Sequence, residues 1–368
     1  MMRKAEKVKN SQDILTEDLE EIFRSLTGDQ LSKLTGKTFL ITGCAGFLGH
    51  HLVNFLCHFS EDLDVRKIIA LDNFLFDKPA WLKLLAEKYP CLKLEEFDVG
   101  KNSISSIQDA EKADYIIHMA SIASPTYYRQ YPIETFEANL LGLKNLLEYY
   151  KRLPVSGILY FSSSEIYGDP PPDCIPTNEA YRGNVATMGP RACYDEAKRS
   201  CETLSYLYAQ CHNLPITLVR PFNNYGPGMR LSDKRVPADF AAAILDNRDI
   251  EIFSDGQPTR TFCYISDAMS GYLKALLLGK FDYFNIGMEF PEISIAKLAE
   301  IYRAVGMQVT GYQGQIRFSP PPERDYLAHN PNRRCPSIAK ARRVLGYAPT
   351  VDIESGIERF LRFLIQKP

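Results

Sequence analysis

The chain has 368 residues, of which 45% are hydrophobic and 24% are charged, and its formal net charge is −2. This is ordinary globular composition, and the near-zero charge argues against a nucleic acid or a membrane surface as a partner. No apolar run reaches the roughly 18 residues that a membrane span needs, and the basic, polar first ten residues lack the apolar core of a signal peptide.

The first predicted element is an amphipathic helix. Leu15, Leu19, Ile22, Phe23 and Leu26 recur at helical spacing with acidic residues between them. We expect this helix to dock on the body of the protein or on a partner subunit. Residues 1–36 are therefore interpreted as an N-terminal helical extension.

A glycine-rich turn follows between a predicted strand, residues 38–42, and an apolar helix. The glycines of Gly43-x-x-Gly46-x-x-Gly49 let the backbone approach a pyrophosphate, whose charge lies at the helix N-terminus. Residues 67–71 predict a second strand, and Asp72 ends it, 23 residues after Gly49. An acid there accepts hydrogen bonds from both ribose hydroxyls, so the pattern predicts NAD rather than NADP.

Strands and helices continue to alternate. Residues 92–97 predict a strand that ends at Asp98-Val99, where the adenine would lie, and residues 115–121 predict a strand with small residues at its carboxyl end. A helix over 136–150 and a strand over 157–162 come next. This alternation predicts an α/β fold with a doubly wound parallel sheet, which binds ligands at the carboxyl ends of its strands.

The helix predicted over 193–212 carries Tyr194 and Lys198, which lie four apart on one helix face. A phenol titrates near pH 10, and a nearby ammonium lowers that pKa. The pair therefore suits a general base that takes a proton from a sugar hydroxyl while hydride leaves the same carbon. On its own, this spacing is more often that of an exposed helix face, and its weight comes from the motifs that precede it.

After a strand over 216–220, arginines appear repeatedly in predicted loops. Several arginines around one cleft would bind a second diphosphate, although each could instead be a solvated surface residue. We expect residues 229–231 and 320–336 to cap the substrate. The arginines are Arg230, Arg235, Arg260, Arg324, Arg333 and Arg334.

Taken in this order, the motifs of residues 37–365 resemble the extended short-chain dehydrogenase/reductase family that acts on nucleotide sugars. The resemblance implies a Rossmann domain over 37–220 and a smaller C-terminal α/β domain, mainly 221–368, that binds the nucleotide diphosphate. Some segments of the second domain are expected to return to the first. The resemblance also implies a homodimer formed through the helices at 136–152 and 194–212.

Within that family the chain is most similar to the UDP-glucuronate decarboxylases, on residues 164–170, 183–185 and 189–199. Sugar 4,6-dehydratases carry Thr-Asp-Glu where this chain has Ser163-Ser164-Glu165, and Ser164 cannot act as their acid. UDP-galactose 4-epimerases usually lack the glutamate. The resemblance therefore implies NAD-dependent decarboxylation of a nucleotide-activated uronic acid. Another NAD-dependent epimerase, 4,6-dehydratase or 4-oxidase is the alternative, whereas Ser163, Tyr194 and Lys198 disfavour a non-catalytic regulatory protein.

The resemblance also implies roles for individual residues. Tyr194, helped by Ser163, would remove the C4 hydroxyl proton, Glu165 would assist protonation at C5, and Arg334 would bind the substrate carboxylate. The predicted catalytic residues are Ser163, Ser164, Glu165, Tyr194, Lys198 and Arg334. Cofactor contacts are predicted for Gly43, Gly46, Phe47, Leu48, Gly49, Asp72, Asn73, Asp98, Val99, Ala120, Ser121, Ala123, Asn139, Ser162, Tyr194, Lys198 and Pro221. Substrate contacts are predicted for Ser124, Asn184, Arg191, Asn223, Arg235, Arg260 and Arg324.

Some residues differ from the decarboxylase pattern, and the cysteines indicate the cellular environment of the protein. The family's C-terminal Arg-Lys-Pro is Arg334-Cys335-Pro336 here, and residues 222–224 and 229–235 also differ. The nine cysteines are an odd number without a Cys-x-x-Cys pair, so neither a disulfide framework nor a metal site is predicted. We expect a cytoplasmic protein without the membrane anchor that many eukaryotic decarboxylases carry.

Overall fold

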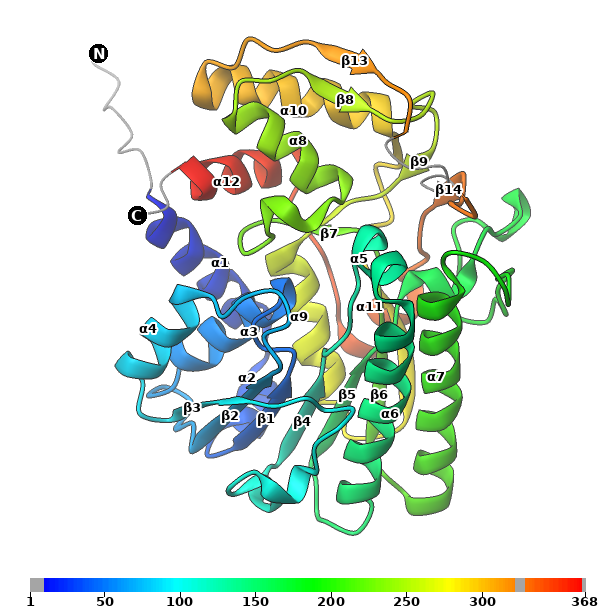
Figure 1. The fold of residues 1–368 in the computed structure, drawn as a ribbon. Helices are drawn as coiled ribbons and strands as arrows, with labels where there is room; N and C mark the ends of the chain where they lie inside the picture. Colours follow the sequence, from blue (N-terminus) through cyan, green and yellow to red (C-terminus); the bar gives the residue numbers. More distant parts are fainter. Residues whose placement is uncertain (1–9, 322–327, 366–368) are drawn as a thin grey trace.

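A computed structural model describes residues 10–321 and 328–365. Its centre is a seven-stranded parallel sheet in the order β11-β6-β5-β4-β1-β2-β3 (Figure 1). The predicted doubly wound parallel sheet is confirmed. The strands are β1 (Thr38–Thr42), β2 (Lys67–Asp72), β3 (Leu92–Glu96), β4 (Tyr115–His118), β5 (Gly157–Phe161), β6 (Ile216–Pro221) and β11 (Asp282–Ile286).

Both faces of this sheet are covered, which explains why its strands are continuously apolar. Side chains alternate along a strand, so Phe39 and Ile41 of β1 join one core and Leu40 joins the other. The first core lies under α3 (Phe47–His58), α4 (Ala80–Lys88) and α9 (Ile265–Leu276), and the second lies under α6 (Pro132–Tyr150) and α7 (Ala192–His212). The helix predicted from residue 136 begins earlier because Pro132 fits a first helical turn.

A smaller α/β lobe lies over the carboxyl edge of the central sheet (Figure 1). Residues beyond 220 build most of it, but β11 and α9 return to the central sheet layer. None of the helices in residues 10–321 and 328–365 combines the length and apolar character that a bilayer crossing requires. The lobe's helices are α8 (Val236–Leu245), α10 (Ile295–Thr310) and α12 (Ile353–Ile365), while α11 (Ala339–Leu345) packs near β11. Its strands are β7 (Asn224–Tyr225), β8 (Ile250–Ile252), β9 (Thr259–Arg260), β10 (Cys263–Tyr264), β12 (Ile293–Ser294), β13 (Ile316–Phe318) and β14 (Arg333–Arg334).

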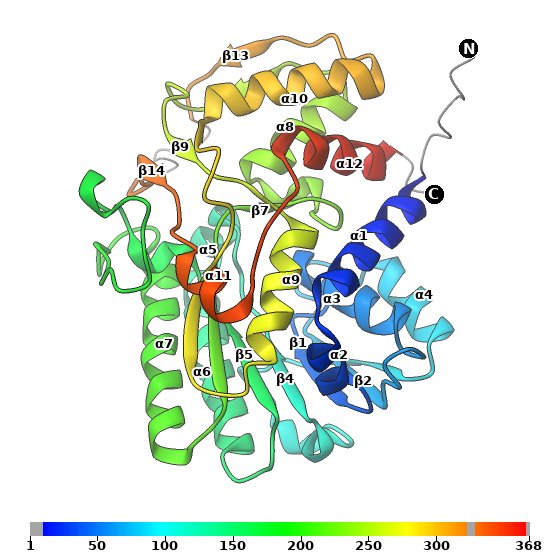
Figure 2. The ribbon, with the colours of Figure 1, turned by 180° about the vertical axis from the view of Figure 1, so that it is seen from behind.

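The N-terminal helix α1 (Ser11–Ser25) lies across the seam between the two lobes and packs on α3, α9 and α12 (Figure 2). A short helix, α2 (Gly28–Leu34), then leads into β1. Asp18 of α1 is fully buried and accepts hydrogen bonds from the Tyr264 hydroxyl at 2.8 Å and from Arg359 Nη1 at 3.1 Å. Arg359 also donates to both carboxylate oxygens of Glu21, each at 2.8 Å. Burial raises the pKa of Asp18 to about 7, and the hydrogen bond from Tyr264 and the charge of Arg359 oppose that rise.

We predict that Arg359→Met lowers the free energy of unfolding by about 3 kcal/mol, because it leaves the Asp18 carboxyl buried without its cation. Urea unfolding at neutral pH measures the change. The matched control is Arg24→Met on α1, whose partner Glu20 is 45% exposed and whose own side chain is 66% exposed. Loss of such a surface pair costs less than about 1 kcal/mol. Equal effects of the two substitutions would contradict a structural role for the buried cluster.

Candidate functional site

A cavity of about 890 Å³ opens at the carboxyl edge of the central sheet, between the two lobes. One wall consists of the segments that follow β1, β2, β4, β5 and β6, and residues of the smaller lobe close it. Open α/β sheets bind their ligands in this crevice. Most of the residues predicted from the sequence to contact cofactor or substrate lie on its wall.

The glycine turn after β1 makes a cradle for a dinucleotide. Gly43 has a φ of +77°, and a Cβ there would lie 2.7 Å from the backbone nitrogen of Ala120, so a larger residue does not fit. Gly46 caps α3 without a side-chain hydrogen bond, which leaves the helix N-terminus open to an anion. Ser121 Oγ, also on the wall, is buried and has no hydrogen-bond partner within the described residues. These features fit a bound NAD, whose pyrophosphate would lie against the turn.

Asp72 lies at the end of β2 on the same wall, as predicted. One carboxylate oxygen accepts the N–H of Ala45 and the other accepts the N–H of Phe74, both at 2.9 Å. Burial raises the pKa of Asp72, and these two backbone bonds oppose the rise. Each oxygen keeps a further acceptor site. Asp72 therefore orders the glycine turn in addition to offering acceptors for a ribose diol.

Tyr194 and Lys198 lie near the start of α7 and line the cavity beside Ser163. Burial raises the pKa of Tyr194 to about 12, although a hydrogen bond with Ser163 lowers it. The ammonium of Lys198 donates to the carbonyl of Phe161 at 2.8 Å and lies 5.6 Å from the centre of the Tyr194 ring. Burial lowers the pKa of Lys198 to about 8. The expected lowering of the phenol pKa by Lys198 is therefore wrong for the protein alone, because burial dominates.

Tyr128 on α5 (Pro125–Gln130) was not predicted and stacks on Tyr194, the predicted base. Its ring centre lies 5.2 Å from that of Tyr194, with 15° between the ring planes. The side chain is 1% exposed, and its hydroxyl has no hydrogen-bond partner within the described residues. The small residues at the end of the preceding strand indicated that this edge of the sheet binds a ligand. No sequence pattern, however, predicts that residues 128 and 194 are in contact.

The carboxylate of Glu165 lies between two arginines that come from different lobes. Arg191, just before α7, contacts one oxygen, and Arg334 of β14 contacts both, with Nη2 at 2.5 Å from Oε2. Burial alone would raise the pKa of Glu165, but the two guanidinium groups lower it to about 2. Arg191 also lies 3.5 Å from Asp195, whose pKa is raised to about 7 by burial and by the Glu165 charge. Glu165 is therefore ionised and firmly held in the free protein.

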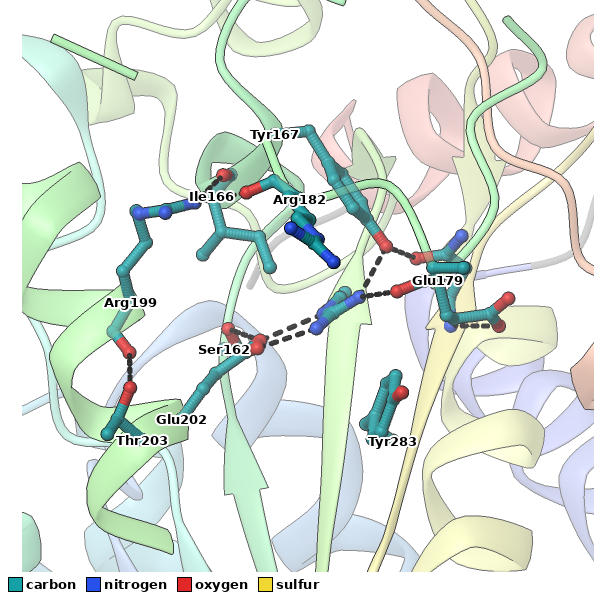
Figure 3. A network of polar contacts seen from close by, with 12 residues as sticks. Ser162, Ile166, Tyr167, Glu179, Arg182, Arg199, Glu202, Thr203 and Tyr283 are labelled. Carbon is teal, nitrogen blue, oxygen red and sulfur yellow. Dashed lines mark hydrogen bonds and ion pairs between the residues drawn. The ribbon is translucent and has the colours of Figure 1, made fainter. Parts of the chain in front are cut away.

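A second buried ion pair fixes α7 behind the tyrosine. Arg220 at the end of β6 pairs with both oxygens of Glu202, at 2.9 and 2.6 Å, and donates to the hydroxyl of Tyr167 at 2.6 Å. Ser162 Oγ donates to Glu202 at 2.5 Å, and Figure 3 shows these two side chains side by side. Ser162, predicted to contact the cofactor, thus lies on the wall with its hydroxyl already engaged.

Two of the predicted residues within the described ranges do not line the cavity. Asn139 is buried within α6, where its amide donates to the Thr135 carbonyl at 2.7 Å. Asn184 pairs with Gly168 through the backbone, and its side chain donates to the carbonyl of Asp169 at 3.2 Å. Arg324 lies outside the described residues.

The remaining predicted residues lie on the cavity wall, although some of their polar groups are already used. Arg260 donates to backbone carbonyls of Thr259, Pro331 and Asn332, so its guanidinium holds the loop before β14. Arg235 pairs with Asp233 at 2.5 and 2.8 Å. The remaining predicted wall residues are Phe47, Leu48, Gly49, Asn73, Asp98, Val99, Ala120, Ala123, Ser124, Ser164, Pro221 and Asn223.

Comparison with known proteins identifies a family that matches most of the chain. Residues 39–287 match the NAD dependent epimerase/dehydratase family. UDP-glucuronic acid decarboxylase 1 of Xenopus tropicalis is 33% identical over 354 residues, which cover 95% of this chain and 78% of that protein. UDP-glucuronic acid decarboxylase 6 of Arabidopsis thaliana is 34% identical over 318 residues, which cover 86% of each.

Solved structures share the fold. UDP-glucose 4-epimerase of Thermotoga maritima with UDP-glucose superposes with a TM-score of 0.75 at 24% identity, covering 89% of this chain and 98% of that one. UDP-glucuronic acid 4-epimerase of Bacillus cereus, in complex with UDP-glucuronic acid and NAD, gives a TM-score of 0.71 at 25% identity, covering 89% and 99%.

We predict that Asp72→Ala weakens the preference for NAD over NADP by roughly tenfold or more, because the carboxylate no longer repels a 2′-phosphate. Fluorescence titration with each dinucleotide gives the ratio of dissociation constants. The control is Glu96→Gln, since Glu96 is the exposed register partner of Asp72 on β3 and lies off the cavity. Equal binding of both dinucleotides by the unaltered protein would contradict the role of Asp72.

Proposed function

Because this chain belongs to the NAD dependent epimerase/dehydratase family, we propose that it decarboxylates a nucleotide-activated uronic acid of the UDP-glucuronate type to the corresponding pentose. The observation that supports this most is the pair of guanidinium groups around Glu165, in the same cavity as Tyr194. Arginine binds carboxylates with two parallel hydrogen bonds, so this end of the cavity suits a sugar that carries a C6 carboxylate.

Tyr194 is the proposed base for the C4 hydroxyl. Ser163 hydrogen-bonds to its phenol, and the ammonium of Lys198 lies nearby in the same buried pocket. NAD, when bound, supplies a reversible acceptor for the hydrogen on C4. In its ionised form, as a phenolate, Tyr194 takes the C4 hydroxyl proton during oxidation and returns it during reduction, so Tyr194 ends the cycle as it began.

Oxidation at C4 makes the C6 carboxylate a β-keto acid. The C5–C6 bond then breaks, CO₂ leaves, and the electron pair is delocalised onto the C4 carbonyl oxygen as an enolate. A proton added at C5 restores the ketone before reduction. Glu165 is the proposed donor, and Arg334 the proposed partner of the departing carboxylate. Ser164 has no carboxyl group with which to expel a C6 hydroxyl, which disfavours a 4,6-dehydratase.

Incubation of the protein with NAD and UDP-glucuronate, followed by mass spectrometry of the product, tests the proposal. Loss of CO₂ is the expected result. The alternative with independent support is a 4-epimerase, since the solved structures with this fold include a UDP-glucuronic acid 4-epimerase. An epimerised product without a mass change would favour that alternative, loss of water would indicate a dehydratase, and accumulating NADH would indicate a 4-oxidase.

We predict that Tyr194→Phe lowers CO₂ release by about a hundredfold or more, because general-base catalysis contributes on that scale. NAD binding, measured by fluorescence, should stay near that of the unaltered protein, since only a hydroxyl is lost. Tyr206→Phe is the matched control on the same helix, where the tyrosine is 49% exposed and does not line the cavity. Retention of most activity by Tyr194→Phe would refute its role as the base.

A further inference from the structure

The contacts of Glu165 conflict with a simple role as proton donor. Its side chain is 18% exposed, and Arg191 and Arg334, at 8% and 9%, enclose its carboxylate. Arg334 forms a bidentate pair with it, which is the geometry that a substrate carboxylate would need from the same guanidinium. A carboxylate held in this way has no proton to give to C5. Some event in the reaction must therefore release it.

We propose that Glu165 occupies, in the free protein, the position of the substrate carboxylate, and that the two carboxylates exchange on Arg334 when the uronate binds. This inference rests on the proposed function and deepens it. The displaced Glu165 takes up a proton from solvent and becomes the acid that protonates C5. Arg334 acts as the binding group and Glu165 as a catalytic residue in successive stages of one cycle.

The two arginines differ in a way that determines which one exchanges. Arg191 lies 3.5 Å from Asp195, so it keeps a carboxyl group as its neighbour when Glu165 leaves. Within the described residues, the guanidinium of Arg334 has no other carboxylate partner than Glu165. Arg334 is therefore free to follow the substrate, whereas Arg191 remains attached to α7.

Charge explains why Glu165 gains a proton after the exchange. Glu165 loses its bidentate pair with the guanidinium of Arg334 and gains the substrate carboxylate as a neighbour. Both changes raise the pKa of a carboxyl group. Burial raises the pKa of Glu165 as well, and the charge of Arg191 opposes this rise less once the carboxylate has moved away from it. The other titratable or charged groups that face Glu165 are Asp195, Tyr194, Tyr128, Arg260 and Arg235.

The proton balance closes over the cycle. Cleavage of the C5–C6 bond releases neutral CO₂, which no longer binds Arg334. The carboxyl of Glu165 gives its proton to C5 and becomes a carboxylate again. It then re-forms the pair with Arg334, and the free-protein arrangement returns. One solvent proton enters with each uronate anion and ends on C5.

Binding measurements in the Tyr194→Phe protein test the exchange, because that substitution blocks turnover. Adding Glu165→Gln removes the competing anion while keeping size and hydrogen bonding. We expect the dissociation constant for UDP-glucuronate to fall about tenfold or more, and that for UDP-glucose to stay the same. Glu292→Gln is the control in the same background, since Glu292 pairs with Arg333 next to Arg334 on β14 but lies off the cavity. It should change neither constant.

Calorimetry in buffers of different ionisation enthalpy provides a second readout that needs no Glu165 variant. The Tyr194→Phe protein should take up protons near pH 7 on binding UDP-glucuronate but not UDP-glucose, and Glu165→Gln should abolish this uptake. Absence of uptake, weaker or unchanged uronate binding after Glu165→Gln, or equal tightening of both ligands would overturn the exchange. If the unaltered protein still releases CO₂, the proposed function survives that result. Failure of UDP-glucuronate to bind at all would overturn both.

Discussion

The buried ion cluster around Glu165 is the constraint on which the active cavity depends. Its carboxylate follows β5 of the central sheet, Arg191 precedes α7, and Arg334 belongs to β14 of the smaller lobe. Removing three charges from water is costly, and such clusters rarely add net stability. The presence of such a cluster in a cavity wall is therefore better explained by a role in binding or chemistry than by a contribution to folding. The cluster exists only when both lobes are in contact, so the carboxylate end of the cavity is assembled by the same closure that forms the cavity.

The rest of the site is held rigid around this cluster. The pair of Arg220 with Glu202 ties β6 to α7 one turn after Lys198, and Arg260 holds the loop that leads to Arg334. Such anchoring limits the motion of Tyr194 and of the backbone at Arg334. What can still change is the partner of a guanidinium at the end of a flexible side chain. A switch in partner at Arg334 needs only side-chain rotation, and this is much faster than any movement of a lobe.

The features of the fold and of the site that could be predicted from the sequence are those formed by residues close together along the chain. The turn containing Gly43 and Gly46 lies between a strand and a helix, and Asp72 closes the next strand, so a local pattern was enough. The spacing of Tyr194 and Lys198 likewise predicted one helix face. The pKa of Tyr194 was predicted in the wrong direction, since burial depends on segments remote in sequence. The partners of Glu165 lie 26 and 169 residues away, and no periodicity joins them. Asn139 and Asn184 were assigned from resemblance alone, and the structure engages both with nearby backbone.

The N-terminal helix connects the stability of the fold to this chemistry. Asp18 and Glu21 of α1 bind Arg359 of α12, while α1 also packs on α3, the helix that follows the glycine turn. One helix thus spans the cofactor-binding half and the lobe that carries Arg334. A hinge between lobes would have to break a fully buried carboxyl away from its partners, which is costly. The lobes are therefore expected to stay closed during the proposed exchange, in which Glu165 would leave Arg334 through movement of its own side chain. The rigid seam between the lobes therefore favours the proposed exchange at Arg334. Replacing Glu165 by another carboxylate requires less free energy than separating the two lobes.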